Sequence, residues 1–118
     1  MVFAPMRRFV FVLLLLAGCS KGPEADLQYI GQARSSAAEW ALVNERASLG
    51  QLTHPYVESM RRSLRSQIKS AKSALTVPGS RYDAEMEALL EQPDEATPQQ
   101  LRAHAERLKQ IEDELESA

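Results

Sequence analysis

The sequence predicts an all-α fold, a small up-and-down bundle of about four helices with a short third helix, behind a cleaved signal peptide. Residues 24–118 are rich in helix-forming side chains and show no alternation of apolar and polar residues with a period of two. Their apolar positions recur every three or four residues, and Gly or Pro interrupts the pattern at 50, 78–79 and 93. Short connections make successive helices antiparallel neighbours. The alternative is an extended hairpin with a loosely packed C-terminal pair of helices.

The first element, residues 1–18, has the pattern of an export signal. Arg7 and Arg8 are its only charges, and the unbroken apolar run 9–16 follows them. Ala17 and Gly18 then supply the small residues that precede a cleavage site. The apolar run is shorter than the roughly 20 residues that a membrane-spanning helix needs. We therefore expect a segment that is removed.

Residues 16–19 read Leu16, Ala17, Gly18 and Cys19, which resembles the lipobox of bacterial lipoproteins. The resemblance implies that Arg7, Arg8 and residues 16–18 serve signal recognition. It also implies a diacylglyceryl group on the thiol of Cys19, cleavage before this residue and acylation of its new amine. Ser20, where aspartate would favour the inner membrane, resembles the default for the outer membrane. The implied location is a lipid anchor in the bacterial envelope, facing the periplasm, in the outer rather than the inner membrane.

Residues 19–23 would then form the lipidated cysteine and a tether, and residues 24–118 one helical domain. The first helix is expected over residues 24–49, with Gly50 as its C-terminal stop. Its stripe consists mostly of small side chains that permit close helix packing: Ile30, Ala33, Ala37, Trp40, Ala41 and Ala47.

The second helix has the most regular apolar pattern. Thr53 suits the N-cap, and Pro55 is tolerated in the first turn. Apolar residues then follow at spacings of 3, 4, 4, 3 and 4, which predicts one core-facing seam: Val57, Met60, Leu64, Ile68, Ala71 and Leu75.

The third helix is expected to be short. Pro78 and Gly79 end the preceding element, Ser80 can cap the new helix with Asp83 at the capping-box position, and Pro93 breaks it.

The fourth helix has a strong start signal in Thr97, Pro98 and Gln100, which combine a threonine cap, a proline at the first position and a capping-box glutamine. Its apolar face is expected at Leu101, Ala105, Leu108, Ile111 and Leu115.

Residues able to carry chemistry are few. Of the two histidines, His54 is expected to be an exposed residue at a helix start, and His104 a partly buried packing residue. Neither belongs to a Glu-x-x-His or His-Glu-x-x-His arrangement, and the sequence has no phosphate-binding glycine loop and no Gly-x-Ser-x-Gly motif. We therefore predict no enzymatic activity, no cofactor and no metal site.

Trp40, the only tryptophan, is interpreted as the largest core side chain of the first helix. The alternative is an anchor for a partner, because tryptophan is enriched at binding hot spots.

Charge is unevenly distributed. Residues 53–75 carry five basic side chains against one acidic, whereas residues 81–118 carry eleven acidic against four basic. Four of the basic residues share one helical face, which we call the basic stripe: Arg61, Arg65, Lys69 and Lys72. It could be solvated with at most weak internal pairing, it could meet anionic lipid headgroups, or it could bind another envelope protein. Without Arg7 and Arg8 the chain has 12 basic and 16 acidic residues, so its net charge is negative. Nucleic acid is therefore not an expected partner.

These features favour a small membrane-anchored lipoprotein that acts as a binding or structural accessory module. Its expected partners are the bilayer, through acylated Cys19, and another envelope protein. A periplasmic lipoprotein that binds a small ligand or metal, or a lipoprotein that inhibits an envelope enzyme, is the alternative.

Overall fold

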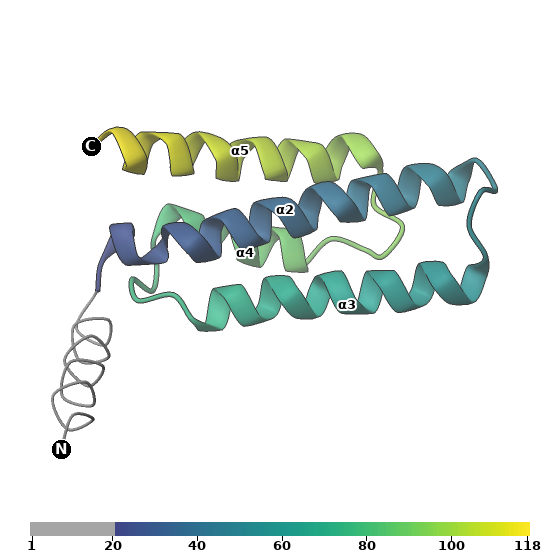
Figure 1. Cartoon of the computed structure of the whole chain (residues 1–118), viewed down its shortest axis with the longest axis horizontal. Helices are drawn as coiled ribbons and strands as arrows, with labels where there is room; N and C mark the ends of the chain where they lie inside the picture. The colour runs from purple at the N-terminus through teal and green to yellow at the C-terminus, as the bar shows by residue number, and fades with distance from the viewer. Residues whose placement is uncertain (1–20) are drawn as a thin grey trace, which may run out of the picture.

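The computed structural model describes residues 21–118 and contains four helices in this range, with no strand. They are α2 (Pro23–Ser48), α3 (His54–Ser73), α4 (Arg81–Leu90) and α5 (Pro98–Ser117). Successive helices run in opposite directions, so that the start of α2 and the end of α5 lie at the same end of the bundle (Figure 1). The predicted all-α, up-and-down fold with a short third helix is confirmed. The predicted signal and lipidation residues lie outside the described residues: Arg7, Arg8, Leu16, Ala17, Gly18, Cys19 and Ser20.

The helix starts follow the predicted capping residues, with one difference in detail. Thr97 and Gln100 form the complete capping box of α5, each side chain bonded to the other residue's backbone N–H at 3.1 Å. Ser80 caps α4 by accepting from the backbone N–H of Asp83. The carboxylate of Asp83 accepts from Gly79 rather than from Ser80, so the box is only half formed. Thr53 stands at the N-cap of α3 without a side-chain bond.

Helix α2 is the central element, because α3 and α5 both pack along its length. Its most extensive contacts are with α5, so the alternative of a loosely packed C-terminal pair is wrong. The fully buried Ala33, Ala37 and Ala41 let the neighbouring helices approach closely. Gly31 faces α5, where a Cβ would lie 2.9 Å from Oε2 at the flexible end of the Glu112 side chain.

The predicted seam of α3 faces this core. Val57, Leu64, Ile68 and Ala71 are at most 3% exposed, whereas Met60 is only partly buried. Because Leu64 and Ile68 stand at the centre of the seam, they carry most of its buried apolar surface.

Helix α4 covers the side of the bundle that α2, α3 and α5 leave open (Figure 1). Its inward side chains, Tyr82, Met86 and Leu89, are buried. With only ten residues, α4 needs additional contacts to hold it in place.

Candidate functional site

The basic stripe of α3 turns toward α4 and the loop that follows it. Arg65 donates from Nη2 to the carbonyl of Leu90 at 2.6 Å and from Nη1 to that of Gln92 at 2.8 Å. The carbonyl of Leu90 belongs to the last turn of α4, where helix carbonyls lack helical partners and attract cations, and that of Gln92 follows two residues later. The guanidinium also lies 5.0 Å from the ring centroid of Trp40. Arg65 therefore caps the C-terminal end of α4.

Two further residues of the stripe bind within the domain. Nζ of Lys72 pairs with Asp83 at 3.2 Å and with Glu87 at 3.3 Å, both on α4. The hydrogen bond to Asp83, followed by that to Glu87, raises the pKa of Lys72. Nε of Arg61 donates to Oδ1 of Asn44 at 2.9 Å. The stripe thus joins α3 to α2 and α4.

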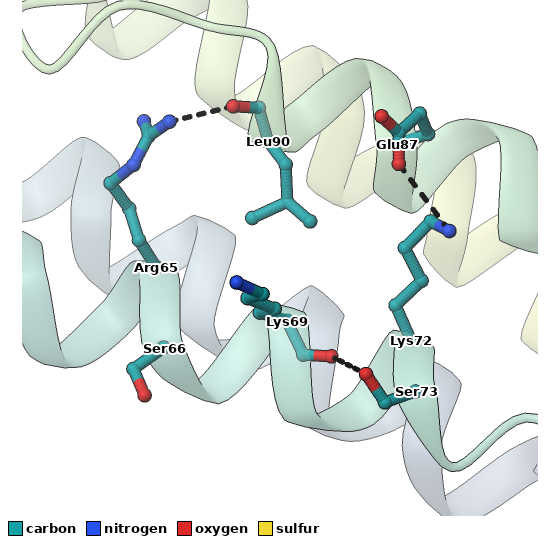
Figure 2. Close-up of a pocket in the computed structure, with 7 residues that line it drawn as sticks. All are labelled: Arg65, Ser66, Lys69, Lys72, Ser73, Glu87 and Leu90. Atoms are coloured by element: carbon teal, nitrogen blue, oxygen red, sulfur yellow. Dashed lines mark hydrogen bonds and ion pairs between the residues drawn. The ribbon is translucent and has the colours of Figure 1, made fainter.

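Between α3 and α4 lies a groove of about 650 Å³. Figure 2 shows its lining, which consists of Arg65, Ser66, Lys69, Lys72, Ser73, Glu87 and Leu90. The ammonium of Lys69 has no hydrogen-bond or ion-pair partner within residues 21–118. Glu87, Asp83 and Asp94, the last 3.5 Å from Arg65, offset the three cations of the groove. The groove therefore carries little net charge, and Arg65 and Lys72 of the basic stripe pair with carboxylates inside the domain.

Trp40 is fully buried, which confirms its interpretation as a core residue and overturns the alternative of a partner anchor. Its indole Nε1–H donates to the carbonyl of Asp94 at 3.1 Å, so the loop between α4 and α5 covers it. Nδ2 of Asn44 donates to the same carbonyl and to that of Ala96 at 2.7 Å. Trp40 and Asn44 together hold this loop against α2.

At the start of α2, a cluster that the sequence analysis did not identify surrounds Asp26, which is completely buried. Oδ1 accepts from the backbone N–H and the hydroxyl of Thr76, at 2.8 and 2.9 Å. Oδ2 accepts from the N–H of Val77 at 3.2 Å and from the hydroxyl of Tyr82 at 2.7 Å. We call this cluster the Asp26 clasp. It joins α2 to the α3–α4 loop and to α4.

The clasp shifts the pKa values of its two acidic groups, the carboxyl of Asp26 and the hydroxyl of Tyr82. Burial acts to raise the pKa of Asp26, but the bonds from Thr76, Tyr82 and Val77 favour the carboxylate, and the net pKa is lowered. Burial, followed by the bond to Asp26, raises the pKa of Tyr82 to about 12. The clasp therefore consists of an ionised Asp26 and a neutral Tyr82 at ordinary pH.

The two histidines take structural positions, as predicted. His54 is exposed and lies 3.2 Å from Glu58. His104 is buried, with Nδ1 2.8 Å from Glu85 and Nε2 3.1 Å from the side-chain amide of Gln92. Because a carboxylate only accepts, Nδ1–H donates to Glu85, and Nε2 accepts from Gln92. Within the described chain this arrangement ties α5 to the end of α4.

Exposed apolar side chains gather at the opposite end of the bundle from the clasp. The large apolar side chains that stand exposed in residues 21–118 are Leu42, Leu49 and Tyr56, at 44%, 63% and 50%. Leu49 lies at the α2–α3 turn, while Leu42 and Tyr56 line a groove of about 210 Å³ together with Glu39, Val43, Arg46, Leu52 and Met60. We call these groove residues together with Leu49 the apolar tip. The apolar tip was not predicted from the sequence, because Leu42 lies off the predicted stripe.

Comparison with known proteins finds no matching family model, no matching curated protein and no matching solved structure. Within residues 21–118, no group of three or more His, Cys, Asp or Glu side chains is placed to hold a metal ion. None of the helices in this range combines the length and the apolar character needed to cross a membrane.

Proposed function

We propose that this chain is a lipid-anchored helical module of a bacterial envelope that binds another protein through its apolar tip. The observation that carries the proposal is the gathering of Leu42, Leu49 and Tyr56 at one end of the described domain. Contiguous exposed apolar residues with a charged rim are typical of protein–protein contact surfaces. Here Glu39 and Arg46 supply the rim.

The place where residue 22 joins the helical domain supports a lipid anchor on Cys19. The backbone N–H of Gly22 donates to the hydroxyl of Thr76 at 2.9 Å. The chain therefore enters the domain at the α3–α4 loop. Helix α2 has 26 residues and spans about 39 Å from there to the tip. A lipid on Cys19, as the lipobox resemblance implies, would hold the domain by the end opposite the tip, and Ser20 favours the outer membrane.

The basic stripe supports a binding role less than the tip does. Arg61, Arg65 and Lys72 already bond to other parts of the domain, and carboxylates offset the charge of the groove beside them. A lipid headgroup or a free anion would have to compete with these bonds. The tip offers apolar surface that no described residue covers.

Photo-crosslinking in the producing cells tests the proposal. A photoreactive residue at Leu42 is expected to give a crosslinked envelope protein, whereas the same residue at Gln110, exposed on α5, is the matched control. Intact-mass analysis should show a chain that begins at an acylated Cys19. The Cys19→Ser variant should lose both the acyl mass and the crosslink. Equal crosslinking at the two positions, or an unmodified chain that retains residues 1–18, would refute the proposal.

A further inference from the structure

We infer that the partner of the apolar tip is a second copy of this chain, paired through α2 of each copy in antiparallel orientation about a two-fold axis. The inference rests on the proposed function of the tip as a binding surface, and it names the occupant. The observation behind it is the order of charged and apolar residues along the exposed part of α2.

Glu39 and Arg46 stand seven residues apart, which is two turns, on the same face of α2. Leu42 and Val43 lie midway between them, and all four residues line the tip groove. Glu39 has no hydrogen-bond or ion-pair partner within residues 21–118. Arg46 donates only Nη1 to Gln51, at 3.2 Å, and keeps its other donors available. Along α2, one acid and one base thus stand at equal distances on either side of Leu42 and Val43.

A two-fold axis between Leu42 and Val43, perpendicular to α2, places Glu39 of each copy opposite Arg46 of the other. The same operation brings the two Leu42 side chains together over the grooves. Each ion pair then forms twice. A parallel pairing would instead set Glu39 against Glu39 and Arg46 against Arg46, which is repulsive. The charge pattern therefore selects the antiparallel copy.

The apolar residues fit the same arrangement. Leu42 and Tyr56 are about half exposed, and Val43, Leu52 and Met60 form the floor beside them. Covering this surface removes apolar area from water on both copies at once. The patch is small, so we expect a weak dimer that anchoring in one bilayer would favour by raising the local concentration. A two-fold axis along the membrane normal, with α2 of each copy lying parallel to the bilayer surface, lets the two N-terminal ends reach the same bilayer.

Disulfide trapping tests the orientation. The domain from Ser20 onward contains the whole described core and lacks Cys19, the only cysteine of the chain. Glu39→Cys and Arg46→Cys are prepared separately and oxidised alone and as a mixture. We expect the mixture to form a disulfide-linked pair and each variant alone to form little. Equal trapping of the separate and mixed samples, or no trapping, would overturn the antiparallel dimer.

Charge reversal tests the ion pairs by sedimentation at micromolar to millimolar concentrations. Glu39→Arg and Arg46→Glu should each raise the dimer Kd by about tenfold, and the double variant should restore it. Lys109→Glu, on α5, is the matched control and should leave the Kd unchanged. Circular dichroism verifies that each variant is folded.

The second copy would be refuted as the partner of the apolar tip if the domain stays monomeric at millimolar concentration. It would also be refuted if neither charge reversal changes the Kd of the dimer. The proposed function fails separately, if Cys19 carries no lipid or if Leu42 forms no crosslink in cells. A crosslink from Leu42 to a different protein, with a monomeric domain in solution, would overturn this inference and support the proposed function.

Discussion

The two ends of this bundle use opposite chemistry. At the end where the chain enters, the Asp26 clasp buries a carboxylate and gives it four donors from three residues. At the α2–α3 end, Leu42, Leu49 and Tyr56 remain exposed although they are apolar. One end places a charge where water is absent, and the other places apolar groups where water is present.

The contrast separates what holds the domain together from what is available for binding. Burying a carboxylate is costly unless its oxygens are well hydrogen-bonded, so the clasp depends on all its donors being in place. At the tip, Leu42, Leu49 and Tyr56 have no comparable contact to lose, because these side chains already face solvent. Changes at the clasp should therefore act on stability, and changes at the tip on association.

The largest effect is expected from Asp26→Ala. This change leaves the donors of Thr76, Val77 and Tyr82 buried without an acceptor and should lower the free energy of unfolding by about 4 kcal/mol. Urea unfolding followed by circular dichroism measures it. Glu24→Ala, which removes an exposed carboxylate from the same turn, is the control and should change little. A small effect at Asp26 would mean that the clasp is not a main support.

The same carboxylate should give the domain an acid-sensitive stability. The pKa of Asp26 is lowered by folding, so its contribution is present above the unfolded pKa and is lost as the pH falls through the folded value. Asp26→Asn should remove this part of the acid dependence.

The next effect compares two leucines given the same truncation. Leu64 is 1% exposed in the core, and Leu64→Ala should cost about 3 kcal/mol of unfolding free energy. Leu42→Ala at the tip should cost less than about 0.5 kcal/mol, because this side chain is 44% exposed. Urea unfolding of the two variants measures both losses of unfolding free energy. Similar losses would show that the tip belongs to the core of the domain.

Alkaline pH should weaken the clasp through Tyr82. Since folding raises its pKa from 10.0 to about 12, its contribution is complete below pH 10 and is lost as the pH rises through 12. The stability advantage of the natural chain over Tyr82→Phe should shrink by about 2 kcal/mol across this range. Thermal unfolding at several pH values measures the difference. Parallel stability curves would contradict a buried, neutral Tyr82 bonded to Asp26.

The smallest effect concerns the basic stripe. Arg65→Gln loses the bonds to Leu90 and Gln92 and should cost about 1.5 kcal/mol. Lys69→Gln, in the same groove but without a bonded ammonium in the described chain, should cost less than about 0.5 kcal/mol. Hydrogen exchange at the end of α4 should accelerate only for Arg65→Gln. Equal exchange in both variants would make the stripe a solvated face.

Much of this fold was predictable because its signals are local. The caps at Ser80 and Thr97 lie within three residues of their partners, and the seam around Leu64 is a simple repeat. These features need no knowledge of distant contacts, and the helix bounds follow the predictions closely.

The polar contacts could not be predicted in the same way. Asp26 and Asn44 continue the apolar stripe of α2, four residues before Ile30 and four after Trp40, so their burial had a sequence signal. Their partners, however, come from loops about 50 residues away. Likewise, nothing in the spacing of Arg65 indicates that it would bond to the end of α4. The spacing of apolar residues along a helix identifies its buried face, but it does not identify the residues of other segments that contact this face.

The hydrogen bond between Gly22 and Thr76 has a mechanical consequence. A pull on the chain at residue 21 would otherwise unravel α2 one turn at a time from its first residue. Gly22 is instead tied to the α3–α4 loop, and Asp26, one turn further along, is tied to the same loop and to α4. A force applied at residue 21 is therefore distributed over α2, the α3–α4 loop and α4. If the chain is anchored through Cys19, the domain can bear such a force without unfolding α2 first.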